Sequence, residues 1–231
     1  MNSVAATAAL LGTVVAGVLL AATPAGAELV LSQLVVDLVP GKQDRADIEV
    51  LNRSPDRSFV TIEPREIVAP GTPDEAARID PDPEKLGILV SPERMVLEPG
   101  ERRLLRIASL APSDRERVYR VTVEPVIGKL SSQSSGLKIL VGYDVLVLVR
   151  PSDPRPHVTG SRSGTDLDLA NDGNLSVELL GGRACDAAMR NCRDLPGGRL
   201  YAGAKRSVPI GRAAKVQYQL KAGAKLIPLQ F

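Results

Sequence analysis

Short runs of apolar and β-branched residues recur along the whole chain, and Pro-Gly or similar turn signals separate them at regular intervals. The run at 117–126 alternates most clearly, because Tyr119, Val121 and Val123 fall on one face of an extended chain. No stretch has a sustained helical period with caps, and residues 73–78 could form one helical turn at most. The runs in the first part of the chain are 29–38, 46–52, 58–68, 87–90, 94–97, 102–108 and 117–126.

This pattern predicts an all-β protein of two domains. About seven short strands with turns between them are typical of an immunoglobulin-like β-sandwich, which we expect over residues 28–151. The stretch "PSDPRP" begins at Pro151 and contains three prolines, so a stiff proline-rich hinge is expected at 152–157. A smaller C-terminal β domain should follow over 158–231. Its expected strand runs are 165–172, 175–182, 199–203, 205–210 and 215–223.

The first 27 residues have the pattern of an export signal. Residues 4–22 contain no charge, and Ala25-Gly26-Ala27 offers a small-x-small cleavage site. The alternative is an uncleaved membrane anchor, because "MNSVAA" lacks the usual basic residue. No later apolar run approaches the ~20 residues that a spanning helix needs. We therefore expect an exported protein without a membrane segment after cleavage.

Cys185 and Cys192 are the only cysteines of the chain. In an oxidising compartment an even number of cysteines favours a disulfide over two free thiols. A metal site would need further ligands, and His157, the only histidine, lies in the hinge. We predict a disulfide between the two cysteines and no metal.

The sequence offers no catalytic constellation. The single histidine has no visible partner for nucleophilic catalysis, and "LLGGRAC" lacks the lysine of a phosphate-binding loop. The acidic residues of 71–85 favour a solvated loop over a calcium site, because they lack EF-hand spacing. A net charge of +2 without a basic block argues against nucleic acid. We therefore expect a binding protein without cofactors, and not an enzyme.

The segment "GLKILVGYDVLVLVRP" at 136–151 poses a problem for a soluble protein. A strand from Leu137 to Val149 would contain about 13 residues, which exceeds the usual strand length. An exposed apolar edge of this kind normally causes aggregation. A polar, serine-rich stretch at 128–135 precedes it. A function that uses the edge would explain why it is there.

Three segments together resemble the PapD-like periplasmic pilus-assembly chaperones: "SPERMVLEPGERRLLRI" at 91–107, "DRERVYRVTVEPV" at 114–126, and "GLKILVGYDVLVLVRP". The resemblance is specific over residues 29–151 and weaker beyond. It implies two immunoglobulin-like domains in an L shape. It also implies a periplasmic chaperone that donates a strand to a pilin-like subunit and then delivers it to an outer-membrane usher.

The resemblance assigns roles to individual residues. It places the three donor side chains on Leu137, Ile139 and Val141, for which the alternative is ordinary sandwich core. It places an interdomain ion pair on Glu116 and Arg150, for which the alternative is a solvated surface pair. It implies a cis peptide bond before Pro92. The family's third charged residue, an Asp in domain two, has no match in "KAGAKLIPLQF".

One departure concerns the family's grip on the carboxylate at the C-terminus of the pilin. The positions of its Arg and Lys anchors are taken here by Val36 and Leu146, which cannot bind an anion. Arg45, Lys138 and Arg150 are basic residues nearby in the sequence, and nothing in the sequence favours one of them. A different function also stays open: an exported structural module that assembles with itself or with a surface complex through its edge strand.

Overall fold

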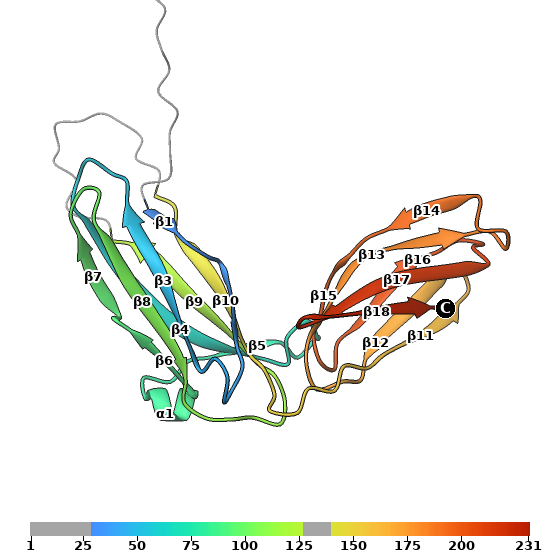
Figure 1. Cartoon of the computed structure of the whole chain (residues 1–231), viewed down its shortest axis with the longest axis horizontal. Helices are drawn as coiled ribbons and strands as arrows, with labels where there is room; N and C mark the ends of the chain where they lie inside the picture. Colours follow the sequence, from blue (N-terminus) through green and yellow to red (C-terminus); the bar gives the residue numbers. More distant parts are fainter. Residues whose placement is uncertain (1–28, 127–139) are drawn as a thin grey trace, which may run out of the picture.

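The computed structural model describes residues 29–126 and 140–231, and it consists of two β-sandwich domains. Figure 1 shows them side by side at an angle, joined below by the segment between β10 and β11, which gives the molecule the expected L shape. The expected signal segment lies outside the described residues. No helix in the described part of the chain is long and apolar enough to cross a membrane.

Domain one contains two sheets. The first has the order β1-β3-β8-β6, and the second has the order β2-β10-β9-β4-β5, with β7 also paired to β4. All pairs are antiparallel except β2 with β10. The strands are β1 (Leu29–Leu31), β2 (Val35–Leu38), β3 (Arg45–Asn52), β4 (Ser58–Val68), β5 (Ala76–Arg78), β6 (Ile88–Ser91), β7 (Arg94–Leu97), β8 (Arg102–Ser109), β9 (Arg117–Pro125) and β10 (Tyr143–Val149).

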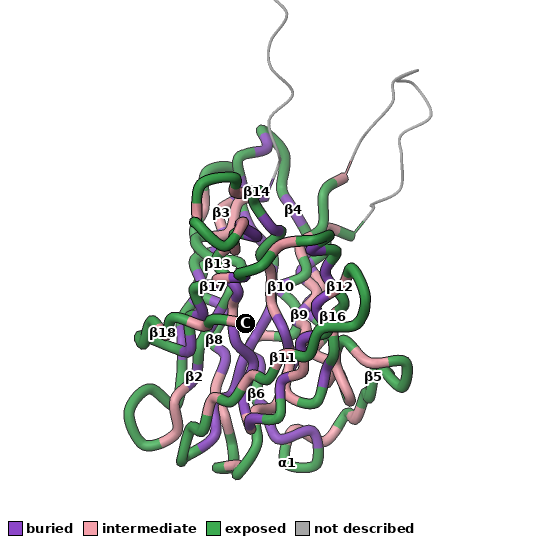
Figure 2. Tube along the Cα trace, turned by 90° about the vertical axis from the view of Figure 1, so that its right-hand side faces the viewer, coloured by how far each residue is buried: buried purple, intermediate pink, exposed green. Residues whose placement is uncertain are grey.

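The core of domain one follows from strand alternation. Every second residue of β3 is buried, and Ile48 and Val50 are fully inaccessible. The predicted alternation of β9 is also correct, because Tyr119, Val121 and Val123, which share one face, all belong to the same buried cluster. Buried stretches lie along the strands, and many of the connecting turns are exposed (Figure 2).

Two local expectations were wrong. The run 29–38 forms two strands, because the chain crosses from the first sheet to the second at Ser32–Leu34. Residues 76–78 form β5, because they pair with the end of β4. A short helix is found instead at α1 (Pro83–Leu86), where Asp82 caps the start and Gly87 adopts the left-handed conformation that ends it.

Domain two has a sheet of order β11-β12-β16 and a second of order β14-β13-β17-β18, with β15 also paired to β13. Cys185 and Cys192 lie opposite each other on β13 and β14 and form the predicted disulfide. Three of its strands, β11, β14 and β18, were not anticipated. The bounds are β11 (Val158–Ser163), β12 (Asp166–Asn171), β13 (Val177–Cys185), β14 (Cys192–Leu195), β15 (Gly198–Leu200), β16 (Lys205–Pro209), β17 (Lys215–Ala222) and β18 (Lys225–Gln230).

Candidate functional site

The edge of β10 is open over its first half. Residues 143–149 all pair with β9, but only Leu146–Val149 pair with β2 on the other side. Among the described residues no strand covers Tyr143–Val145 on that side, because β1 belongs to the opposite sheet. Main-chain N–H and C=O groups of an uncovered edge can accept a strand from another chain.

The residues named as strand donors lie at or before the start of this edge. Leu137 and Ile139 fall outside the described residues. Val141 is described and its surface is 43% exposed. Within the described residues the strand begins only at Tyr143, and residues 140–142 are not in a strand. Gly142 and the proline at position 125 explain this, since glycine weakens a strand and proline donates no ladder hydrogen bond.

The second half of the same strand is ordinary core. Val145, Val147 and Val149 are at most 1% exposed and belong to the buried cluster of domain one. The segment 140–149 therefore combines an exposed, unpaired beginning with a fully packed end. The two parts can be tested separately by substitution.

Val36 and Leu146, which replace the expected anchors, are both buried. Val36 belongs to the core of domain one, whereas Leu146 packs with Val118 and Leu148 against Tyr201 of domain two. They therefore lie in different clusters and cannot form one anion site. Of the nearby basic residues, Lys138 is outside the described residues and Arg45 lies at the start of β3.

Two arginines that the sequence did not single out lie beside Leu146. Arg120 pairs with Leu146 across β9 and β10, and Arg65 pairs with Arg120 across β4 and β9. Both line a cavity of about 370 Å³ that also includes Asp144 and Tyr201. This row could be recognised only from strand register, which the sequence does not contain.

The guanidinium of Arg65 makes short hydrogen bonds, whereas that of Arg120 makes only long contacts in the described structure. Nη2 of Arg65 lies 3.0 Å from Oδ1 of Asp144, and its Nη1 donates to the Thr122 hydroxyl. Nε of Arg120 lies 3.9 Å from Oδ2 of Asp144, and its Nη1 lies 3.5 Å from the Asp144 carbonyl oxygen. Strong charge-assisted hydrogen bonds are about 2.7–2.9 Å long. Toward the described residues, Arg120 therefore keeps donors for an additional acceptor.

Arg150 and Glu116 are brought together at the domain boundary. Nη1 of Arg150 lies 2.5 Å from Oε2 of Glu116, and the side chain of Glu116 is only 1% exposed. The second carboxylate on Arg150 is Asp37 of β2, at 2.6 Å. Both carboxylates belong to domain one, and domain two contributes the neutral Ser176, whose oxygens lie 3.3 and 3.4 Å away. Asp37 and Ser176 were missed because only the fold brings them to Arg150.

Ser91 and Pro92 are joined by a cis peptide bond. It lies where the chain leaves β6 of the first sheet and enters β7 of the second. Pro92 thus lies at a crossover between the two sheets. In the second sheet β4 and β9 separate β7 from β10 and its open edge. Its place in the fold is structural.

An exposed apolar row lies at one end of domain one. Phe59 of β4 pairs with Val96 of β7, and its carbonyl oxygen accepts from the N–H of Val126 on the other side. Phe59 and Val126 are each 48% exposed, and Val96 is 38% exposed. Contiguous exposed apolar side chains commonly mark a protein interface.

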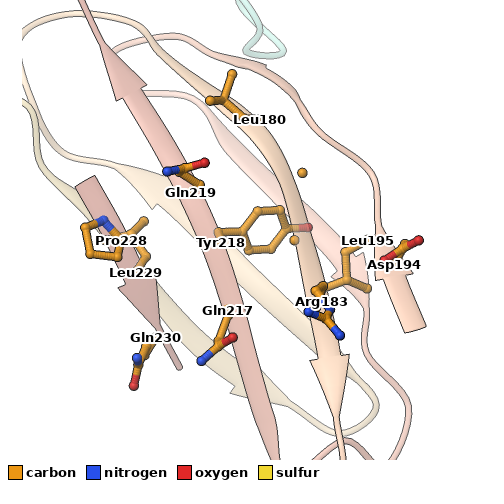
Figure 3. A pocket seen from close by; sticks show the side chains of 12 residues that line it. Leu180, Arg183, Asp194, Leu195, Gln217, Tyr218, Gln219, Pro228, Leu229 and Gln230 are labelled. Atoms are coloured by element: carbon orange, nitrogen blue, oxygen red, sulfur yellow. The ribbon is translucent and has the colours of Figure 1, made fainter. Parts of the chain in front are cut away.

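Domain two has a hollow of about 530 Å³ over β13, β17 and β18 (Figure 3). The ring of Tyr218 reaches from β17 across to β13, where a Cβ on Gly182 would lie 2.7 Å from it. Gln217 and Gln219 lie on either side of Tyr218 along β17. In the described residues no group of three or more His, Cys, Asp or Glu side chains could hold a metal ion, here or elsewhere.

Comparison with known proteins identifies the fold and the family. Residues 29–154 match the model of the pili and flagellar-assembly chaperones, PapD N-terminal domain. The chain belongs to this family. Two curated relatives are fimbrial proteins of Escherichia coli. The one from the CS1 fimbriae is 25% identical over 64% of this chain. The match spans 65% of that relative's own length, which is less than two thirds of it. The one from the CFA/I fimbriae is 24% identical over 68% of each chain.

Solved structures of fimbrial chaperones have the same two-domain fold. The class 5 fimbriae chaperone CfaA superposes with a TM-score of 0.70 at 21% identity, over 88% of this chain and 97% of its own. A Salmonella enterica complex of the SafA pilin with the SafB chaperone gives a TM-score of 0.61 at 16% identity, over 91% of this chain and 98% of that one. The PapD-like family is one of chaperones rather than enzymes.

Proposed function

We propose that this protein is a periplasmic chaperone that donates a strand to a fimbrial subunit, holds it, and delivers it to an outer-membrane usher. The observation that carries the proposal is the uncovered first half of β10. Residues 1–27 would direct export and be removed. The family and the pilin complex of the SafB chaperone support this assignment.

Strand donation uses the two halves of the segment differently. The packed half, Val145–Val149, fixes the strand in domain one. The preceding residues, with Leu137, Ile139 and Val141, would extend along the pilin and place alternate side chains in its groove. Main-chain hydrogen bonds would give a ladder that does not depend on the pilin's sequence, and the three side chains would add selectivity.

Asp substitutions in the two halves test this proposal. Val141→Asp and Ile139→Asp should abolish subunit capture in a periplasmic pull-down, because a charge would enter an apolar groove at a cost of several kcal/mol. Neither should change thermal unfolding much. Val147→Asp should unfold domain one, because this side chain is fully buried. Variants at 139 and 141 that fold and still capture the subunit would contradict strand donation from this segment.

We further assign the grip on the subunit's C-terminal carboxylate to Arg120. Its guanidinium has unused donors, lies beside the apolar position of the expected lysine, and lines a cavity between the domains. A carboxylate bound there would replace the long contacts of Arg120 to Asp144, and the carboxylates of Asp144 and Glu75 also line the cavity. Arg65 is held by Thr122 and Asp144 and would support the site rather than bind directly.

The usher needs a surface that the subunit leaves free. The row of Val96, Phe59 and Val126 meets this need, because it lies across β7, β4 and the end of β9 and does not include the open edge of β10. We propose that the usher docks on this row. An exported structural module would instead use the edge of β10 for its own copies, and light scattering of the purified protein would then show oligomers without any pilin.

A further inference from the structure

Asn174 lies in the turn between β12 and β13 and joins three segments of the chain. Its Nδ2 donates to the carbonyl oxygens of Asp114 and Asp153, both at 2.8 Å. Its Oδ1 accepts from the N–H of Arg155 at 2.7 Å. Asp114 belongs to domain one, whereas the other two are in the linker. One side chain thus ties domain two to both.

The backbone of Asn174 adds a further bond across the boundary. Its carbonyl oxygen accepts from the N–H of Glu116 at 2.8 Å, directly before β9. Arg150, by comparison, reaches domain two only through contacts of 3.3 and 3.4 Å to Ser176. In the described part of the chain, the short polar bonds between the domains therefore belong to Asn174 and not to the ion pair.

The turn that carries Asn174 is held firmly in domain two. The neighbouring Asn171 is 1% exposed, and its Nδ2 donates to Leu175 and Leu200, both at 2.9 Å. A Cβ at Gly173 would lie 2.6 Å from the carbonyl oxygen of Arg155, so only glycine allows the linker to pass this closely. Because the turn is rigid, the side chain of Asn174 holds the segments that it binds at a fixed position relative to domain two.

We propose that Asn174 is the positioning residue that sets the angle between the two domains. Tyr201 of domain two packs against the cluster of Val118, Leu146 and Leu148 in domain one and acts as the apolar support for this angle. The cleft with Arg120 lies on the same interface, so the angle also determines the shape of that cavity. This last consequence rests on the proposed function, whereas the angle itself does not.

The angle can be measured in the free protein, without any pilin. Spin labels on Lys42→Cys and Arg212→Cys, both exposed and one in each domain, report the interdomain distance by pulsed electron resonance. Asn174→Ala and Asn174→Asp should shift or broaden the distance distribution. The Asp variant keeps the acceptor for Arg155 but turns a carboxylate toward two carbonyl oxygens.

Asp172→Ala is the matched control. It lies in the same turn, but its carboxylate accepts from Thr159 within domain two, so its loss should leave the distance unchanged. Thermal unfolding of all three variants should remain close to that of the parent. Unaltered distance distributions in both folded Asn174 variants would overturn the proposal. Loss of folding in both would also overturn it, because it would make Asn174 a folding residue.

Subunit capture is measured separately with the same variants. We expect about a tenfold loss of affinity for Asn174→Ala, comparable to losing one or two net hydrogen bonds. If the parent protein captures no pilin, the proposed function is wrong, and the distance measurement still decides the role of Asn174. If the distances change and affinity does not, the link between angle and cleft is wrong.

Discussion

Arg150 and Glu116 form a buried ion pair at the domain boundary, in which Nη1 lies 2.5 Å from Oε2 and the two side chains are 10% and 1% exposed. The other oxygen of Glu116 is buried without a hydrogen-bond partner in the described structure. Because both charges are buried, removing either one would leave the other unpaired in a poorly solvated site.

The two ion pairs of Arg150, with Glu116 and with Asp37, should therefore differ in coupling energy. In double-mutant cycles with Arg150→Met, Glu116→Gln should show a coupling energy above about 1 kcal/mol, because removal of one buried partner leaves a charge unpaired. Asp37→Asn should show about 0–1 kcal/mol, because Asp37 is 51% exposed. Chemical denaturation measures both. Equal coupling energies would show that burial does not separate the two pairs.

The stability of domain one should depend on acid through Glu66. Burial alone would raise the pKa of this carboxyl, but hydrogen bonds from Arg117 and Arg78 outweigh it and hold the pKa below its usual value. Because the folded-state pKa is lowered, the stabilisation is present above the usual Glu value and is lost as pH falls through the folded pKa. The free energy of unfolding should therefore decrease as the pH drops below about 4.5, the usual value for Glu. Glu66→Gln should fall less steeply, and an identical slope would contradict this assignment.

The disulfide should stabilise domain two selectively. In the chain-entropy model, closing the loop between Cys185 and Cys192 contributes about 2–3 kcal/mol. Cys185→Ser with Cys192→Ser should lower the unfolding midpoint of domain two and leave domain one unchanged, as followed by calorimetry. Alkylation of the unfolded, unreduced parent protein should label no thiol. Two labels per chain would remove the disulfide from the account.

Arg120 should matter for subunit capture and not for folding. Arg120→Ala should weaken capture about tenfold or more, because a charge-assisted hydrogen bond to a carboxylate would be lost. Arg120→Lys should retain part of the affinity. Arg102→Ala is the control, since Arg102 lies on the other sheet and pairs with Glu49. A pilin whose C-terminal carboxylate is amidated should bind the parent protein and Arg120→Ala equally. If Arg120→Ala still bound the free acid more tightly than the amide, the anchor would lie elsewhere.

Phe59 should matter for delivery and not for capture. Phe59→Asp should leave the chaperone–pilin complex intact but prevent its binding to the usher in a pull-down, because a charge would face the partner's apolar surface. Leu104→Asp provides the comparison, since Leu104 is 53% exposed on the opposite sheet of domain one. Loss of usher binding in both variants would point to a general surface effect.

The sequence was sufficient where periodicity determines structure. The bounds of β4 and β7 agree with the runs at 58–68 and 94–97, and the alternation of β9 was predicted correctly. Prediction from the sequence was wrong where the pairing partner of a segment determines whether and where a strand forms. Residues 29–38 read as one strand, because no local signal marks the change of sheet at Ser32–Leu34, and residues 76–78 became a strand only through β4.

The candidate site shows the same limit. The pairing of Arg150 with Glu116 was suggested by family resemblance, but Asp37 and Ser176 reach Arg150 through the β2–β10 register and the packing of the domains. Arg65, Arg120 and Leu146 come together only across three strands. Asn174 bonds to three backbone groups, and backbone partners leave no complementary side chain in the sequence to suggest them.

The change of sheet at Ser32–Leu34 has a consequence for anyone who engineers this protein. Substitutions that let residues 29–38 continue alongside β10 would cover Tyr143–Val145 and remove an exposed edge. Such variants should express better, aggregate less and melt at a higher temperature. Under the proposed function they would also be inactive, because the chain would have filled its own binding position. Selection for thermostability alone would therefore enrich the variants that no longer work.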